Sequence, residues 1–362
     1  MRLTRLFFGI ALFCCTSLAN AHDFEISLKN GQRLYFNITD SAKRTVEVTY
    51  QGSITNPSRA KFSGDLVLTS KVRYKNKVYS ITSIGAKAFS NNKELKSIEM
   101  PVGIKQIDDF AFEGCSSLTR VAFPSNTVKI GTGVFFGCTS LNSVVLGSEW
   151  TAVNLKDFEW SKSLKKIKIP ARVKSLKNLK SLSYLEKIEI DSDNQFFKSV
   201  DGSLYSKNGE TLLGCPKGHQ GKLVIADGTK TVNRGAIADC RNLTRVVIPM
   251  TVKNLSFREF SLLTKLKEIV MKADTPIMTA KKDGKEEFLL VVANTDANLV
   301  VNRKSKKEYA NKIVTDSGEY TDIVTAQNNN QEGVLAMPYH VDSAMTINKN
   351  HIIGVKNFDD FK

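Results

Sequence analysis

The chain has 362 residues, of which 41% are hydrophobic and 24% are charged, proportions that are normal for a soluble globular protein. Beyond residue 21 no apolar stretch is long enough to cross a membrane, so we expect no transmembrane segment there. The formal net charge of +16 favours acidic partners or surfaces, although positive charge that merely keeps a long protein soluble is an equally simple interpretation.

Residues 1–21 have the pattern of a secretory signal peptide. Two arginines precede an apolar run over residues 6–18, and Ala19-Asn20-Ala21 supplies the small residues that a signal peptidase requires. We therefore expect cleavage after Ala21, a mature chain that begins at His22, and a secreted or cell-surface location.

Residues 22–80 predict a small β-rich unit. Asn30-Gly31 is a hairpin turn signal between two strands that are rich in β-branched and aromatic residues. A second hairpin turns at Lys75-Asn76. Because a stack of repeats would otherwise expose its apolar interior at the end, we expect this unit to act as an N-terminal cap. The expected strands are 24–28, 33–38, 45–50, 71–74 and 77–80.

A repeat governs the sequence from residue 81 to 271. Segments 95–117 and 118–140, each of 23 residues, align position by position, with matching apolar residues, a proline, a phenylalanine and a cysteine. The motif L-x-x-I-x-I-P followed by A-F-x-x-C is typical of a leucine-rich repeat, in which a short parallel strand is followed by an irregular or helical return. Later repeats begin at Leu141, Leu164, Leu185, Gln220, Leu243 and Leu266.

This periodicity predicts a leucine-rich repeat solenoid. One coil buries too little apolar surface to be stable alone, so neighbouring coils must share their burial and their backbone hydrogen bonds. The coil from Leu141 is degenerate, with Trp150 and Trp160 where the consensus is lost, and the coil from Leu164 has 21 residues. The phenylalanines at repeat spacing are expected in the core: Phe89, Phe112 and Phe135.

Three further segments interrupt or follow the repeats. An insertion at about 191–219 predicts a β-hairpin or a short three-stranded unit that projects from the stack. Residues 272–326, with a helical stretch around Tyr309, are expected to form a C-terminal α/β cap. Residues 327–362 read as a polar linker and a tail, with one further hairpin expected around 346–353.

Six cysteines raise the question of disulfides. Cys14 and Cys15 lie in the signal segment, where a lipid anchor is the alternative to cleavage. Equivalent residues on adjacent coils lie about 4.8 Å apart with parallel side chains, whereas a disulfide needs β-carbons about 3.8 Å apart and turned toward each other. We therefore expect buried thiols, with oxidation in an exported protein as the open alternative. The mature chain would keep Cys115, Cys138, Cys215 and Cys240.

These repeats resemble the BspA-type, or treponemal-type, leucine-rich repeat proteins, which are secreted or surface proteins of host-associated bacteria. The resemblance covers roughly residues 23–326. It includes the segments 64–68, 201–205 and 299–309 as well as the I-P and A-F-x-x-C motifs of the repeats. It implies a non-catalytic protein that adheres to host proteins, to other cells or to surfaces.

The strands predict which side chains face outward. In L-x-x-I-x-I the first, fourth and sixth residues point into the core, so the third and fifth lie on the exposed face. A row of cations then lies beside a partly apolar row. Adjacent like charges cost about 1 kcal/mol in water, which a bound polyanion or acidic protein would offset, although a solvated lysine face is the alternative. The candidate ligand-binding residues are Arg120, Lys166, Lys168, Lys187, Lys222, Arg245, Val224 and Val247.

No motif indicates catalysis. The four histidines occur without a metalloprotease or nucleophile signature, so we expect no enzyme activity, cofactor or metal. Residues 191–194 begin like a calcium loop, but Phe196 stands where the glycine is needed, so a simple turn is expected. No nucleic-acid-reading motif accompanies the charge. We expect a host extracellular or bacterial surface protein, or an acidic glycan, as partner. The alternative is a structural or polysaccharide-handling envelope protein with no protein ligand.

Overall fold

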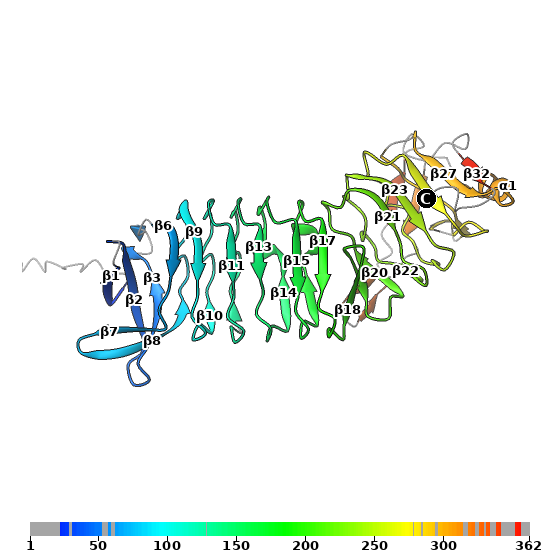
Figure 1. Cartoon of the computed structure of the whole chain (residues 1–362). Coiled ribbons are helices and arrows are strands. Elements are labelled where there is room, and N and C mark those ends of the chain that lie inside the picture. Colours follow the sequence, from blue (N-terminus) through cyan, green and yellow to red (C-terminus); the bar gives the residue numbers. More distant parts are fainter. Residues whose placement is uncertain are drawn as a thin grey trace, which may run out of the picture.

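The chain forms an elongated rod in the computed structural model, with the N-terminal strands at one end and helix α1 (Lys306–Lys312) at the other (Figure 1). The coils follow one another along the rod, and the C-terminal part is tilted relative to the first coils. Each helix in the described part of the chain is too short or too polar to cross a membrane. The structure describes residues 22–28, 31–52, 57–58, 62–127, 129–277, 279–283, 285–293, 296–313, 318–322, 326–328, 331–333, 338–341 and 352–355. The predicted signal segment, with Cys14 and Cys15, lies outside these residues.

The N-terminal end contains both hairpins that the sequence predicts. The first two strands are antiparallel to each other, the third is antiparallel to the second, and the long strand of the later hairpin then adds in parallel to the third. These strands are β1 (Phe24–Ser27), β2 (Arg33–Asp40), β3 (Thr45–Thr49), β7 (Lys71–Tyr74) and β8 (Lys77–Ile84), beside the short pair β4 (Gln51–Gly52) and β5 (Pro57–Ser58).

One long face of the rod, called here the strand face, carries the parallel strands of successive coils. Ser97, Arg120 and Ser143 lie side by side on three neighbouring strands. The stacked sheet starts before residue 81, because β6 already pairs with β9. The strands of this face are β6 (Ser63–Val67), β9 (Glu94–Glu99), β11 (Arg120–Ala122), β13 (Ser143–Val145), β15 (Lys166–Ile169), β17 (Lys187–Ile190), β21 (Gly221–Val224), β23 (Leu243–Ile248), β24 (Glu268–Met271), β27 (Asn298–Asn302) and β32 (Ile352–Val355).

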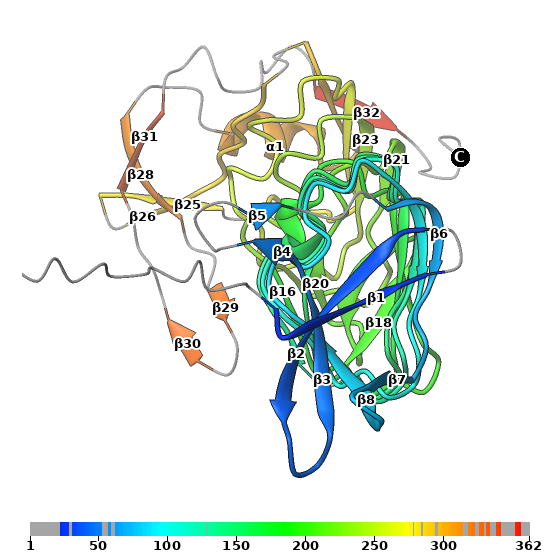
Figure 2. The same cartoon turned by 90° about the vertical axis from the view of Figure 1, so that its left-hand side faces the viewer.

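The return segments form the opposite side of each coil, called here the return side. Viewed from the N-terminal end, the coils superpose, with β6 and β16 on opposite sides of the stack (Figure 2). The strands here are only two or three residues long and pair in parallel with their neighbours. The elements are β10 (Gln106–Ile107), β12 (Lys129–Ile130), β14 (Ala152–Asn154), β16 (Ser175–Lys177) and β22 (Thr231–Val232), with the 3-10 helices η1 (Leu155–Phe158) and η2 (Leu179–Ser181).

A ladder of phenylalanines fills the interior of the first coils. Phe89, Phe112 and Phe135 are fully buried, as predicted, and Phe158 extends the ladder. Their rings stack nearly parallel, with centroid distances of 5.1, 5.2 and 5.7 Å between successive members. Identical side chains at one position of each coil therefore pack on one another along the axis.

The described cysteines are buried free thiols, in agreement with the predicted ladder. Cys115 Sγ donates to the Phe89 carbonyl and Cys138 Sγ to the Phe112 carbonyl, each at 3.1 Å. The neighbouring Cys115 thiol and burial both raise the pKa of Cys138 well above its ordinary value. The pKa of Cys240 is raised in the same way, by Cys215 and by burial.

The insertion is part of the stack rather than a projecting unit. Its strands β18 (Phe197–Val200), β19 (Ser203–Ser206) and β20 (Thr211–Gly214) are antiparallel, and β20 then pairs in parallel with β22. Leu204, Tyr205 and Leu212 are at most 4% exposed, because this unit continues the apolar interior.

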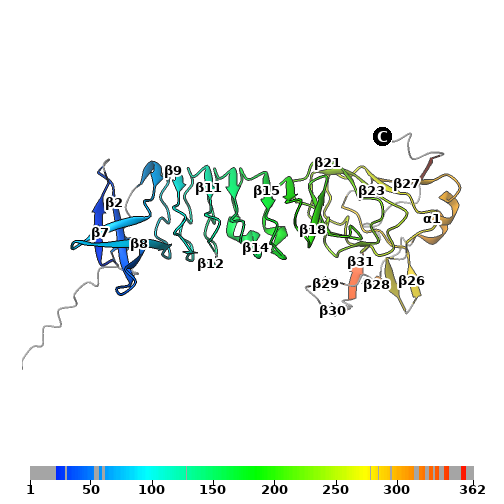
Figure 3. The ribbon, with the colours of Figure 1, turned by 60° about the horizontal axis from the view of Figure 1, so that its bottom comes forward.

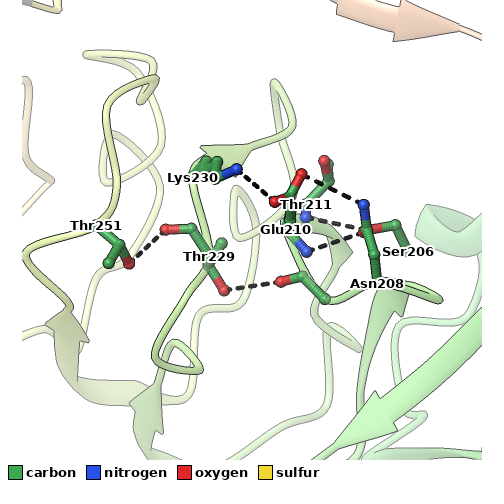
Figure 4. Close-up of polar contacts among 8 residues, drawn as sticks. Ser206, Asn208, Glu210, Thr211, Thr229, Lys230 and Thr251 are labelled. Carbon is green, nitrogen blue, oxygen red and sulfur yellow. Dashed lines mark hydrogen bonds and ion pairs between the residues drawn. The ribbon is translucent and has the colours of Figure 1, made fainter.

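Polar contacts join the insertion to the next two coils (Figure 4). Lys230 forms an ion pair with Glu210. Thr229 Oγ1 donates to the Gly209 carbonyl at 3.3 Å, and Thr251 Oγ1 donates to the Thr229 carbonyl at 2.8 Å. A side-chain hydrogen bond thus links each coil edge to the one before it.

The buried side chains form two large clusters that meet within β19. Leu204 belongs to the N-terminal cluster and Tyr205, the next residue, to the C-terminal cluster. Because successive side chains of a strand point to opposite faces, β19 acts as a wall between two cores.

The segments predicted as C-terminal cap and tail also contribute to the stack. β27 and β32 both add in parallel to the strand face, so Ile352 and Ile353 extend this sheet. The rest of the hairpin expected around 346–353 lies outside the described residues. The predicted helical stretch is α1, and the predicted polar linker contains a hairpin of β29 (Ala326–Asn328) and β30 (Gln331–Gly333). A separate sheet beside the rod contains β25 (Ala280–Lys282), β26 (Lys285–Glu287), β28 (Gly318–Asp322) and β31 (Pro338–Val341) (Figure 3).

Candidate binding surface on the strand face

The parallel register brings several of the predicted cations into one row. Lys166 lies beside Lys187 on β15 and β17, and Lys222 lies beside Arg245 on β21 and β23. Arg120 lies between two serines on β11. The row is interrupted between β17 and β21, where the insertion enters the stack.

Carboxylates of the next coil neutralise part of this row. Lys168 Nζ lies 3.1 Å from Asp191 Oδ2, and Lys166 Nζ lies 4.0 Å from Glu189 Oε1. The hydrogen bond from Lys168 is the main cause that lowers the pKa of Asp191. The chain itself therefore offsets much of the like-charge repulsion that the sequence predicted here.

Arg245 is held more tightly than the lysines. Its Nε lies 3.0 Å from Glu268 Oε2, and the two side chains are only 17% and 27% exposed. A partly desolvated pair of this kind is stronger than an exposed one, but less of it is accessible to a ligand.

Three predicted cations are exposed and lie outside the ion pairs above, whereas Lys166 and Lys168 are exposed but paired. Arg120, Lys187 and Lys222 are exposed, and none forms an ion pair with another residue in the described ranges. The stem of Lys187 lies across Gly202 in the insertion, where an added β-carbon would come within 2.9 Å of Lys187 Cγ. These three residues are called the open cations below.

The two predicted valines differ in exposure. Val224 is 39% exposed, as expected, but Val247 is only 8% exposed and does not offer the free surface that the sequence predicted. The reason is that Val247 packs in a buried cluster with Val270 and Val300 on the next two strands. The strand face therefore exposes apolar surface at Val145 and Val224 but not at Val247.

The turn into the insertion has the structure that the sequence predicted. The Asn194 amide donates to the carbonyls of Pro170 and Val173, and its Oδ1 accepts from the amides of Phe196 and Phe197. Its side-chain oxygen thus holds the turn itself, and its side-chain nitrogen ties the turn to the preceding coil. Over the described ranges, no group of three or more His, Cys, Asp and Glu side chains could hold a metal ion.

Comparison with known proteins places this architecture in a family. A model described as the BspA type leucine rich repeat region matches six copies over residues 67–199 and 219–280, which is more than half of the chain. The chain belongs to the BspA-type leucine-rich repeat family. No curated protein gives a significant match to this BspA-type chain.

Several solved structures are similar to this BspA-type protein. The pneumococcal vaccine antigen PcpA is 16% identical over 81% of this chain and 97% of its own, with a TM-score of 0.44. A leucine-rich cell surface protein from Faecalibacterium prausnitzii is 19% identical over 78% and 89%, with a TM-score of 0.40. A leucine-rich repeat protein from Eubacterium ventriosum is 19% identical over 75% and 76%, with a TM-score of 0.43.

One feature of this BspA-type chain was missed by the reasoning from sequence. On the return side, Trp160 and Tyr184 are 53% and 38% exposed and line the same hollow. The signal in the sequence was the unusual coil from Leu164, which has 21 residues.

Proposed function

We propose that the protein is an exported, non-catalytic binding protein whose strand face contacts an acidic surface of another protein, on a host cell or on another bacterium. The observation that carries this proposal is the exposure of the open cations, Arg120, Lys187 and Lys222, beside exposed valines. Membership of the BspA-type family agrees with it.

The shape of the strand face favours a protein partner. The parallel strands form a long face made of three successive sheets, on which Val145 and Val224 are exposed on the same side as the cations. Protein interfaces combine apolar contact with complementary charge, and the charges mainly raise the rate of association and the specificity. An acidic glycan that contacted the cations alone would leave the valines unused.

Export and capping belong to the same proposal. The signal-peptide pattern of residues 1–21 supports cleavage after Ala21 and a secreted or cell-surface location. The 23-residue period supports a regular solenoid between residues 81 and 271. The strands of residues 22–80 and the segment 272–326 would then shield the two ends of its apolar interior.

A triple charge reversal of the open cations tests the proposal. The mature chain and the Arg120→Glu/Lys187→Glu/Lys222→Glu variant would be compared for binding to arrayed extracellular-matrix and bacterial surface proteins, at low and at physiological salt. We expect salt-sensitive binding to acidic proteins that falls at least tenfold in the variant, because repulsion replaces attraction at three positions.

A matched variant controls for net charge. Lys77→Glu/Lys105→Glu/Lys129→Glu changes the charge equally at three exposed lysines outside the strand face. Its binding should stay within about twofold of the parent, since these charges lie away from the contact. Equal loss in both variants, or retention of binding by the open-cation variant, would refute the strand face as the site.

A further inference from the structure

A groove crosses the return side where a short coil interrupts the stack. The coil from Leu164 to Tyr184 has 21 residues, two fewer than each of the preceding coils. Three adjoining hollows surround its return segment, which contains η2. The first hollow contains Trp160 and Tyr184, the second contains Asn178, and the third contains Gly235. Ser181 and Ser183 line both the first and the second hollow, and Lys180 lines both the second and the third. The shortened return therefore leaves a continuous groove between its neighbours.

Two exposed aromatic side chains form one end of this groove. Trp160 comes from the coil before the short one, and Tyr184 from the end of the short coil itself. Lys165 Nζ lies 5.7 Å from the centroid of the Tyr184 ring and also pairs with Glu186 at 3.4 Å. Exposed aromatic rings beside cations are recognition surfaces for ligands that are partly apolar and partly anionic.

The backbone at Trp160 shows that the fold does not need a tryptophan there. Its φ is 66°, and the equivalent residues of earlier coils, Asn91, Gly114 and Gly137, have φ values of 60°, 67° and 74°. Glycine and asparagine accept this left-handed conformation readily, whereas a bulky side chain is strained in it. The indole of Trp160 is half exposed, so its burial compensates little for that strain. Stability of the fold therefore does not explain why a tryptophan occupies this position.

The rest of the groove offers polar groups of several kinds. Asn178, Ser181 and Ser183 supply an amide and hydroxyls, and Lys180 supplies an exposed cation. Lys217 is already paired with Asp239 at 3.4 Å, and Glu159 adds one carboxylate to the lining. The Lys180 ammonium lies against Gly235, where an added β-carbon would come within 2.1 Å of Nζ. Glycine at 235 therefore leaves room for this cation between the second and third hollows.

We propose that this groove binds an oligosaccharide that carries carboxylate or sulfate groups. The rings of Trp160 and Tyr184 would stack on the apolar faces of sugar rings, and the serines and Asn178 would exchange hydrogen bonds with sugar hydroxyls. The exposed ammonium of Lys180 would pair with an acidic group of the sugar. The site is independent of the strand face, because all of these residues lie on return segments or on the turns that follow them.

Tryptophan fluorescence tests this proposal directly. The chain has two tryptophans, and the other one, Trp150, is 7% exposed, so an external ligand reports mainly through Trp160. The mature protein would be titrated with acidic oligosaccharides from alginate and from chondroitin sulfate, and with neutral maltohexaose. We expect a saturable change in fluorescence with at least one acidic probe, and at least tenfold weaker binding of maltohexaose.

Variants separate the groove from the strand face and from stability. By calorimetry, Trp160→Gly should bind the acidic probe at least tenfold more weakly, and its melting temperature should equal or exceed that of the parent, because glycine suits the left-handed backbone. Tyr184→Ser should weaken binding in the same direction. The open-cation variant should bind the probe as the parent does. Equal affinity of Trp160→Gly and the parent, equal affinity for maltohexaose, or no saturable binding of either acidic probe would overturn the proposal.

Discussion

The Asp157 carboxylate accepts a hydrogen bond of 3.0 Å from the backbone amide of Gly133, one coil earlier in the stack. Asp157 is 7% exposed, and burial is the main cause that raises its pKa to about 6. The charge of Asp109 raises the pKa further, while the Gly133 amide lowers it. Because the pKa is raised on folding, the folded chain binds this proton more tightly than the unfolded chain, and stability falls as the pH rises through 6.

Asp157→Asn should therefore stabilise the protein at neutral pH. The neutral amide keeps an oxygen for the Gly133 amide without a buried charge, so we expect a gain of up to about 3 kcal/mol at pH 7.5 that vanishes near pH 4. Urea unfolding between pH 4 and pH 7.5 measures it. Asp191→Asn is the control, with an expected change of opposite sign. Because the hydrogen bond from Lys168 lowers the pKa of Asp191, this substitution should lower the free energy of unfolding, and only at neutral pH. A gain for Asp157→Asn that does not change with pH would contradict the burial of a charge.

Arg245 should matter for stability more than for binding. In Arg245→Ala the partly buried Glu268 loses its partner, and we expect the free energy of unfolding to fall by about 1–3 kcal/mol. Lys187→Ala, at an exposed position without an ion pair among the described residues, should stay within about 0.5 kcal/mol of the parent. Urea unfolding of both variants decides this, and equal effects would show that the Arg245–Glu268 contact adds nothing.

Phe112 is stacked on both sides, so its truncation should be costly. Phe112→Ala removes ring contacts with Phe89 and Phe135 and leaves a cavity in the ladder, for which we expect a loss of about 3–5 kcal/mol. Val145→Ala, at a side chain that is 47% exposed, serves as the control for surface truncation. Thermal unfolding compares the two, and a small loss at Phe112 would mean that the coils close around the gap.

The thiol ladder predicts slow chemical modification. Cys115 and Cys138 are fully buried, and the raised pKa of Cys138 keeps it protonated at neutral pH. Thiolate is the reactive form, so maleimide labelling of the folded mature chain should be slow and should become complete in denaturant. Intact mass after labelling in denaturant should show four modified cysteines. A mass with fewer labels would reveal a disulfide.

Local patterns in the sequence were enough to predict much of the stack. The alternation of each strand placed Arg120, Lys187 and Lys222 on the exposed side, because a strand's side chains alternate irrespective of distant contacts. The burial of Val247 could not be read in this way. It depends on Val270 and Val300 in neighbouring strands, and the strand of Val300 lies in the segment predicted as a cap.

The ion pairs and the groove show the same limit. Asp191 pairs with Lys168 because β15 and β17 fix one register, which the sequence suggests only once the coils have been aligned. The groove arises because the coil from Leu164 is two residues shorter than the preceding coils, and a shortened coil leaves no residue motif that predicts a groove. The sequence signal of the groove is Trp160, which occupies a position where earlier coils have glycine or asparagine.

The division of the interior at β19 bears on how proteins of this design change length during evolution. Leu204 completes one core and Tyr205 begins the other, so a coil inserted or deleted on one side leaves the packing on the other side intact. Each such step changes the reach of the rod by about 4.8 Å. A lineage could therefore adjust the spacing between its two ends in small increments while the strands around the insertion, and the groove beside them, are inherited unchanged.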